Sequence, residues 1–179
     1  MEPHDADGKG PAALARVRLL AMDVDGVLTD GRVIYGDGLE VQEFHVADGL
    51  GLKLLMQSEV AVTWITGRGC EATRRRAAEL GVAELHVGAG PKDRVLAEVQ
   101  ARLGIGPEHT AAMGDDLPDL AMRSRAAFFA APANARAEVR ERADLVTDAA
   151  GGAGAVRELA ELLLRAQGRW TAILDALGG

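Results

Sequence analysis

Short apolar runs alternate with segments of helical spacing along almost the whole chain. The apolar runs cover residues 17–22, 60–65, 84–87, 110–113, 126–130 and 144–146. Helical spacing fills the segments between and after them, at 50–57, 71–80, 94–103, 117–123, 135–142 and 156–164. Such alternation is typical of a parallel sheet with helices on both faces. The sequence therefore predicts an α/β fold, a three-layer Rossmann-like arrangement around a parallel sheet of about six strands.

One segment interrupts this alternation. Residues 32–35 and 39–44 flank Gly36-Asp37-Gly38, which predicts a projecting β-hairpin over about residues 32–44 with a three-residue turn. A lone hairpin is marginally stable in water, so this one is expected to pack against a partner surface.

The chain is expected to form one domain. Residues 1–15 are polar and then Ala-rich, and they predict a loose N-terminal leader. Residues 16–179 then form the single domain, which ends in a C-terminal helix and tail over about 153–179.

Composition excludes several classes of function. The 179 residues include 27 acidic and 20 basic side chains, giving a net charge of −7, which argues against nucleic-acid or anionic-membrane partners. The single cysteine, Cys70, rules out a disulfide framework. No apolar run approaches the roughly 18 residues of a membrane span, and the start has no signal-peptide pattern. These features lead us to expect a cytoplasmic protein.

Chemically reactive residues follow four of the predicted strands. Asp23 and Asp25 come after the first strand, Thr66 ends the second, Lys92 opens the helix after the third, and Asp115 follows the fourth. Ligands of open parallel sheets bind at the carboxyl ends of the strands. We therefore expect these side chains to converge in one cleft.

The residue types in this cleft point to phosphoryl transfer. Asp23 and Asp25 are two apart in an extended chain and face one side, where they repel unless a cation lies between them. Together with Asp115 they make an all-oxygen set that suits Mg²⁺. Lys92 can neutralise a phosphoryl group and Thr66 can donate a hydrogen bond to it. One Asp can then attack phosphorus while the other protonates the leaving oxygen.

Each of these motifs taken alone has a simpler explanation. An isolated Asp-x-Asp commonly caps a turn, a Thr-Gly pair commonly is a turn, and a lysine near a helix start is commonly a surface residue. However, the chain has 17 Arg and three Lys, so composition does not favour lysine at position 92. The order of the four motifs, each after its own strand, is what makes chance improbable.

The sequence resembles the haloacid dehalogenase superfamily of phosphatases. The motifs that carry the resemblance are DVDGVLTDG at 23–31, ITGR at 65–68, Lys92 and GDDLPD at 114–119. Over about residues 17–168 it is most similar to the cap-less subfamily that hydrolyses 3-deoxy-D-manno-octulosonate 8-phosphate. Thr29-Asp30-Gly31 before the hairpin, HVADGLG at 45–51 and GGAGAVRE at 151–158 support that subfamily.

The resemblance implies a role for each matched residue. Asp23 is the implied nucleophile that forms an aspartyl-phosphate, and Asp25 the implied general acid/base, which also binds metal through its backbone carbonyl. Thr66 and Lys92 stabilise the phosphoryl group, and Asp115 completes a Mg²⁺ site with Asp23 and Asp25. The implied substrate-binding set is Asp25, His45, Val46, Ala47, Asp48, Gly49, Arg68, Arg76 and Lys92.

The resemblance also implies a substrate class and an assembly. The substrate is a phosphorylated 2-keto-3-deoxy sugar acid, used in lipopolysaccharide precursor synthesis. Members of the family are homotetramers that associate through their hairpins. This sequence departs from many members at Ala47, where they carry Arg, so a nine-carbon sugar-acid 9-phosphate of the sialic-acid type remains an alternative substrate.

Two classes without phosphatase activity are alternatives. A phospho-accepting receiver domain uses similar residues, but its accepting Asp follows the third strand, which here ends in Val87-Gly88. An inactive scaffold that works through its hairpin is disfavoured by the intact acidic set.

Overall fold

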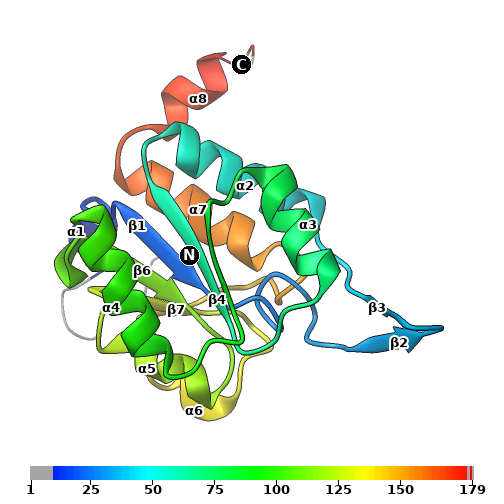
Figure 1. Cartoon of the computed structure of the whole chain (residues 1–179). Coiled ribbons are helices and arrows are strands. Elements are labelled where there is room, and N and C mark those ends of the chain that lie inside the picture. The colour runs from blue at the N-terminus through cyan, green and yellow to red at the C-terminus, as the bar shows by residue number, and fades with distance from the viewer. Residues whose placement is uncertain (1–9, 177, 179) are drawn as a thin grey trace.

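A single parallel sheet forms the centre of the molecule. The computed structural model describes residues 10–176 and residue 178 (Figure 1). Its six-stranded sheet has the order β5-β4-β1-β6-β7-β8, and every neighbouring pair is parallel. The strands are β1 (Leu19–Met22), β4 (Ala61–Thr66), β5 (Glu84–Val87), β6 (Thr110–Met113), β7 (Phe128–Ala131) and β8 (Leu145–Val146). The predicted α/β fold with six parallel strands is confirmed.

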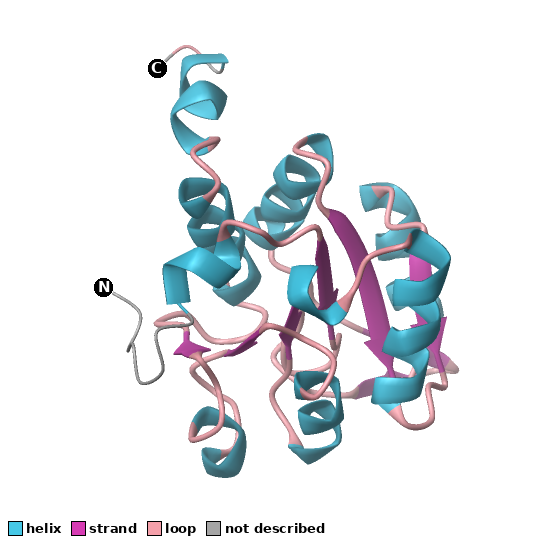
Figure 2. Ribbon diagram, turned by 90° about the vertical axis from the view of Figure 1, so that its left-hand side faces the viewer, coloured by secondary structure: helices cyan, strands magenta, loops and turns pink. Residues whose placement is uncertain are grey.

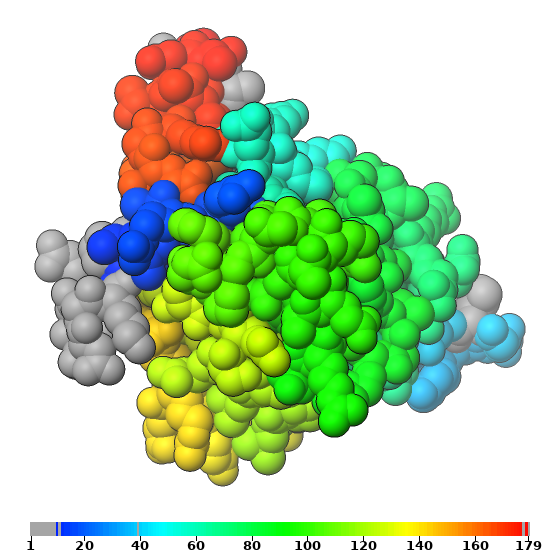
Figure 3. Space-filling view, turned by 60° about the vertical axis from the view of Figure 1, so that its left-hand side comes forward, coloured from blue at the N-terminus to red at the C-terminus, as the bar shows by residue number. Residues whose placement is uncertain are grey.

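Helices cover both faces of this sheet (Figures 1 and 2). One face packs against α1 (Gly10–Leu14), α2 (Val46–Gln57), α3 (Glu71–Leu80) and α7 (Ala155–Ala166). The other packs against α4 (Lys92–Leu103), α5 (Leu120–Arg123) and α6 (Ala137–Arg140). Two short 3₁₀ helices, η1 (Pro107–His109) and η2 (Leu117–Asp119), precede β6 and α5. The last helix, α8 (Trp170–Ala176), extends away from the body of the molecule (Figure 3).

The strands are apolar on both faces because both faces are buried. In β1, Leu20 and Met22 belong to the core on the α2 and α7 side, while Leu19 and Ala21 belong to the core on the α4 side. This division follows the two-residue period of a strand. A run without polar positions, such as Leu19–Met22 within the predicted segment 17–22, is typical of a strand between two helical layers.

The predicted hairpin projects from the sheet domain (Figure 1). Its strands are β2 (Ile34–Gly36) and β3 (Leu39–Val41), paired antiparallel with Gly36 opposite residue 39. The turn therefore contains only Asp37 and Gly38, with φ of 25° and 81°. Positive φ at both positions is characteristic of a type I′ turn. The expected three-residue turn is wrong, because Gly36 still belongs to the strand.

Helix α2 begins at Val46, earlier than the segment 50–57 that helical spacing indicated. Gly49 and Gly51 weaken the helix pattern in the sequence. Both face neighbouring helices at close range: a Cβ at Gly49 would lie 3.0 Å from Leu80, and one at Gly51 would lie 3.2 Å from the backbone of Arg157. Close packing between helices thus requires glycine at positions 49 and 51, and these glycines are the reason why the sequence pattern did not indicate the first turns of α2.

The two ends of the described chain pack on the core. Residues 1–9 of the expected leader lie outside the described residues, whereas Ala13 and Leu14 of α1 are buried in the core. Trp170 of α8 is buried beneath two guanidinium groups, with Arg165 4.8 Å and Arg157 5.6 Å from its ring centroid. None of the described helices has the length and apolar character needed to cross a membrane.

Candidate active site

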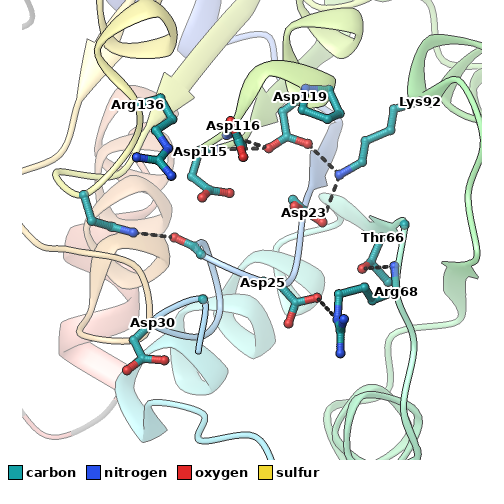
Figure 4. A pocket seen from close by; sticks show the side chains of 15 residues that line it. Asp23, Asp25, Asp30, Thr66, Arg68, Lys92, Asp115, Asp116, Asp119 and Arg136 are labelled. Carbon is teal, nitrogen blue, oxygen red and sulfur yellow. Dashed lines mark hydrogen bonds and ion pairs between the residues drawn. The ribbon is translucent and has the colours of Figure 1, made fainter. Parts of the chain in front are cut away.

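A cleft of about 520 Å³ lies at the carboxyl ends of the strands (Figure 4). Its walls come from the segments that follow β1, β4, β6 and β7 and from the first residue of α4. The lining residues are Asp23, Asp25, Gly26, Asp30, Gly31, Thr66, Gly67, Arg68, Lys92, Asp115, Asp116, Pro118, Asp119, Asn134 and Arg136. The structure thus brings together Asp23, Asp25, Thr66, Lys92 and Asp115, as the order of motifs indicated.

A buried ammonium group connects three of the wall segments. The Lys92 side chain is 5% exposed, and its Nζ lies 2.9 Å from Asp23 Oδ1 and 2.5 Å from Asp119 Oδ1 (Figure 4). Burial lowers the pKa of Lys92, but the two carboxylates outweigh burial and the net shift is upward. Lys92 therefore remains charged and can neutralise an incoming phosphoryl group.

Asp119 holds the loop that carries Asp115. Its Oδ2 accepts hydrogen bonds from the backbone N–H groups of Asp115 at 2.9 Å and Asp116 at 3.1 Å. Gly114 leaves the space that the Asp119 side chain fills, since a Cβ there would collide with it. Asp119 ends the GDDLPD motif but was not predicted to be a site residue. Its signal was present in the motif, because Asp at N-cap followed by Asp three residues later is a capping-box pattern, and the structure forms that box around η2.

The carboxylates of Asp23, Asp115 and Asp119 offer oxygens that lie within 4.8 Å of one another. Asp119 is already engaged by Lys92 and two N–H groups, whereas Asp115 Oδ1 is buried without a hydrogen-bond partner. Asp23 and Asp115 are therefore the side chains available to hold a cation. An all-oxygen set of this kind fits Mg²⁺. Of the predicted ligands, the Asp25 side chain lies outside this group.

The pKa values of the Asp23 and Asp115 carboxyl groups are raised by burial and by nearby carboxylates. Burial, with the nearby Asp119 carboxylate, raises the pKa of Asp23 to about 6 against the opposing effect of Lys92. Burial and the charges of Asp119 and Asp23 raise the pKa of Asp115 to about 7. Without a cation, both groups therefore hold a proton to a higher pH than an ordinary aspartate does.

Close contacts between loops fix the position of the cation-binding residues. Gly26 has φ of +90°, and a Cβ there would collide with the Asp115 carboxylate. The Asn134 side chain donates to the Gly26 carbonyl at 3.1 Å and accepts from the Gly151 N–H at 2.6 Å. The Gly-rich segment before α7 therefore supports the floor of the cleft, where any side chain at Gly151 would meet the Gly26 carbonyl.

Asp25 and Thr66 lie on the opposite wall from Asp115 (Figure 4). Asp25 Oδ1 accepts a hydrogen bond from Gln42 Nε2 at 2.7 Å, and its Oδ2 lies 3.8 Å from Arg68 Nε. The buried Thr66 hydroxyl accepts from the Arg68 N–H at 3.1 Å, which leaves its own hydrogen available for a ligand. Sequence reasoning did not identify Gln42, because the residue lies in the hairpin and not at a strand end of the sheet.

The two arginines predicted to bind the sugar acid have different surroundings. Arg68 lines the cleft and pairs with Glu40 of the hairpin at 2.7 Å. Arg76 is not among the lining residues; its Nη1 lies 3.0 Å from Glu79 and its guanidinium packs over the ring of Phe44. A second lining arginine, Arg136, follows β7 and was not assigned from sequence.

Residues 45–49 lie outside the cleft of their own chain. His45 is the N-cap of α2, Val46 is 81% exposed and Ala47 is half-buried. Asp48 is buried and accepts a hydrogen bond from the Arg157 N–H at 2.8 Å, at the start of α7. Burial raises the pKa of Asp48 despite this bond. Within one chain, the structure therefore gives Asp48 a helix-capping contact.

Comparison with known proteins identifies the family. A model described as haloacid dehalogenase-like hydrolase matches residues 88–159. The 3-deoxy-D-manno-octulosonate 8-phosphate phosphatase of Escherichia coli strain K12 is 41% identical over 159 residues, 88% of this chain and 85% of the relative. That of Haemophilus influenzae is 36% identical over 167 residues, 93% of this chain and 92% of the relative. This chain belongs to the 3-deoxy-D-manno-octulosonate 8-phosphate phosphatase family of haloacid dehalogenase-like hydrolases.

Solved structures of this phosphatase family share the fold. A crystal structure from Moraxella catarrhalis, in complex with magnesium ion, phosphate ion and a KDO molecule, has a TM-score of 0.91 and 40% sequence identity, covering 93% of this chain and 97% of that one. A probable phosphatase from Pseudomonas syringae has a TM-score of 0.92 and 41% identity, covering 97% and 99%. The predicted family and enzyme class are confirmed: the chain is a phosphatase.

The raised pKa of Asp115 predicts how pH affects stability without metal. The folded protein holds this proton up to about pH 7, whereas the ordinary pKa is 3.8, so it binds more protons than the unfolded chain between these values. The free energy of unfolding therefore falls as pH rises through this window. Asp115→Asn removes that dependence, so it should exceed wild type in melting temperature at pH 8 and approach it near pH 4.

Thermal melts of both proteins in chelator, between pH 4 and 8, check this expectation. Mg²⁺ should then raise the melting temperature of wild type more than that of Asp115→Asn, because a ligand stabilises only the fold that binds it. Parallel pH curves for the two proteins would contradict the assignment of the raised pKa to Asp115.

Proposed function

We propose that this phosphatase hydrolyses 3-deoxy-D-manno-octulosonate 8-phosphate to the free sugar acid and phosphate, with Mg²⁺, in lipopolysaccharide precursor synthesis. The observation that carries the proposal is the juxtaposition in one cleft of Asp23, paired with buried Lys92, and the unpartnered Asp115 oxygen. The relatives named for this reaction support the choice of substrate.

The positions of the cleft residues support the following reaction. The Asp23 carboxylate attacks phosphorus and forms an aspartyl-phosphate, while Asp25 gives its proton to the departing sugar oxygen. Asp25 then takes a proton from the water that attacks the aspartyl-phosphate, which releases phosphate and restores Asp23. Lys92 and the Thr66 hydroxyl bind the phosphoryl oxygens throughout. Mg²⁺ held by Asp23, Asp115 and the Asp25 carbonyl supplies the positive charge that keeps these carboxylates ionised beside a phosphate.

The far end of the substrate is a carboxylate, and an arginine fork is well shaped to bind it. Arg68 lines the cleft and supports this role. Ala47 stands where many relatives carry Arg, so the contact with the carboxylate depends more on Arg68. A nine-carbon sugar-acid 9-phosphate would present the same carboxylate on a longer chain and is the alternative substrate.

Asp23→Asn tests the nucleophile, since it preserves size and removes the attacking carboxylate. Phosphate release from 3-deoxy-D-manno-octulosonate 8-phosphate should fall by about 10³-fold or more. In chelator above pH 7, the melting temperature of the variant should be equal to or higher than that of wild type. For wild type, EDTA should abolish turnover and Mg²⁺ should restore it.

The same assay on a panel tests the substrate. Wild type should prefer the eight-carbon sugar-acid phosphate over its nine-carbon analogue and over neutral sugar phosphates. A tenth or more of wild-type activity in Asp23→Asn would refute the covalent mechanism. A wild-type preference for the nine-carbon acid would identify the nine-carbon sugar-acid 9-phosphate as the substrate.

Arg68→Ala tests recognition of the carboxylate. Loss of a charge-assisted contact costs about 1.5–3 kcal/mol, so kcat/KM for the sugar-acid phosphate should fall roughly ten- to a hundred-fold. The loss on an aryl phosphate, which has no distal carboxylate, should be smaller. Arg140→Ala, at an exposed arginine of α6 outside the cleft lining, is the matched control. Equal losses on both substrates for Arg68→Ala would place that side chain at the phosphoryl group.

We further propose that the protein is a homotetramer assembled through its hairpins. Among the described side chains of the hairpin, Tyr35 is 74% exposed, Ile34 47%, Val41 46% and Val33 38%, and Val46, which follows the hairpin at the start of α2, is 81% exposed. An apolar surface on a projecting hairpin favours association. Residues 45–49 follow the hairpin in the chain and lie outside their own cleft, so an adjoining subunit would offer the site at which they contact substrate.

Light scattering and sedimentation test the assembly. Wild type should have the mass of four chains, and Ile34→Asp should shift it to smaller species by burying a charge at the interface. Leu174→Asp, at an exposed leucine of α8, is the matched control and should leave the mass unchanged. A stable, fully active wild-type monomer would contradict the proposal.

A further inference from the structure

One hairpin side chain contacts both the proposed general acid/base and helix α3. Gln42 follows β3 and is partly buried. Its Nε2 donates to Asp25 Oδ1 at 2.7 Å, and its Oε1 accepts from the Thr73 hydroxyl at 2.6 Å and from the Cys70 thiol at 3.1 Å. We propose that Gln42 is a positioning residue that orients the Asp25 carboxyl for proton transfer to the leaving group.

The chemistry of its neighbours fixes which way the amide points. An ionised Asp25 can only accept a hydrogen bond, so it faces the NH₂ group. The Thr73 hydroxyl and the Cys70 thiol can both donate, and they face the carbonyl oxygen. Thr73 is 1% exposed, so its hydroxyl has little access to water and holds Gln42 in place. Each end of the amide is therefore satisfied in one orientation only.

Because of this contact, the two carboxyl oxygens of Asp25 have different roles. Gln42 occupies Oδ1, while Oδ2 has Arg68 Nε at 3.8 Å, beyond hydrogen-bond distance. Oδ2 is thus the oxygen left to carry the proton in the first step and to receive one in the second.

The inference rests on the proposed phosphatase mechanism and is tested by varying the leaving group. An alkyl oxygen, as in a sugar phosphate, needs a proton to depart, whereas a nitrophenolate departs without one. Misalignment of a general acid therefore slows the alkyl ester and spares the aryl ester. A residue that only stabilised the fold would affect both esters alike.

The test compares Gln42→Met, which keeps the length of the side chain and removes both hydrogen-bonding groups, with Thr73→Val, which removes only the group that anchors Gln42. In Gln42→Met, kcat for the sugar-acid phosphate should fall about tenfold or more, with little change in KM. The fold-loss in kcat for a nitrophenyl phosphate should be at least five times smaller than the fold-loss for the sugar-acid phosphate. Thr73→Val should also lower kcat more for the sugar-acid phosphate than for the nitrophenyl phosphate, but both losses should be smaller than in Gln42→Met. The double variant should be little worse than Gln42→Met, because both act through one contact.

Thr63→Val is the matched control. Its hydroxyl is also buried and donates at 3.1 Å, but to the Glu84 carbonyl between β4 and β5, outside the cleft. It should lower the melting temperature without changing the alkyl-to-aryl ratio. Equal losses on both esters in Gln42→Met, or no loss on either, would overturn the positioning role.

The two proposals fail in distinguishable ways. A wild-type enzyme that prefers another alkyl phosphate to sugar-acid phosphates refutes the proposed substrate, and the alkyl-to-aryl comparison is then made with that ester. An unchanged ratio in both variants refutes the role of Gln42 whichever substrate is preferred. Absence of any phosphatase activity in wild type would overturn both.

Discussion

The ion pairing of Lys92 is the interaction on which the rest of the active site depends. A single ammonium group, almost wholly buried, lies between Asp23 after β1 and Asp119 after β6, and thereby joins three segments that are distant in the sequence. Removing the Lys92 ammonium would leave the buried Asp119 carboxylate uncompensated, which is strongly destabilising. Lys92 also explains why Asp119 can be buried, and Asp119 in turn holds the loop that presents Asp115.

The charge balance of this cluster dictates what it can bind. Three carboxylates, Asp23, Asp115 and Asp119, share one ammonium when all are ionised, so two negative charges remain uncompensated. The raised pKa values of Asp23 and Asp115 are the response of the metal-free site to that excess. A divalent cation would remove the excess and keep Asp23 ionised, as its proposed role as nucleophile requires. The same cation offsets the charge of a phosphate, which could not otherwise approach so acidic a wall.

Sequence reasoning succeeded where one principle decides the outcome. Apolar runs located the strands, and the common edge of parallel strands placed Asp23, Thr66, Lys92 and Asp115 in one cleft. It failed where the outcome depends on which element lies alongside. Gln42 lies where the projecting hairpin rejoins the sheet domain, and nothing in the pattern of the hairpin encodes its contact with Asp25. The roles predicted for residues 45–49 and Arg76 remain predictions, since their side chains lie outside the cleft of their own chain.

The hairpin connects assembly with chemistry through the alternation of a strand. Side chains two residues apart share a face, so Glu40 and Gln42 face the cleft, where they contact Arg68 and Asp25, while Val41 between them is exposed on the other side. A second subunit that packs on Val41 would therefore restrict the backbone of the strand that carries Glu40 and Gln42. In a phosphatase whose single chain leaves the cleft open, Ile34 and Val41 of the surface proposed for association thus lie on the opposite face of the hairpin from Glu40 and Gln42. Packing of the hairpin between subunits would fix the orientation of Asp25 as well as close the site.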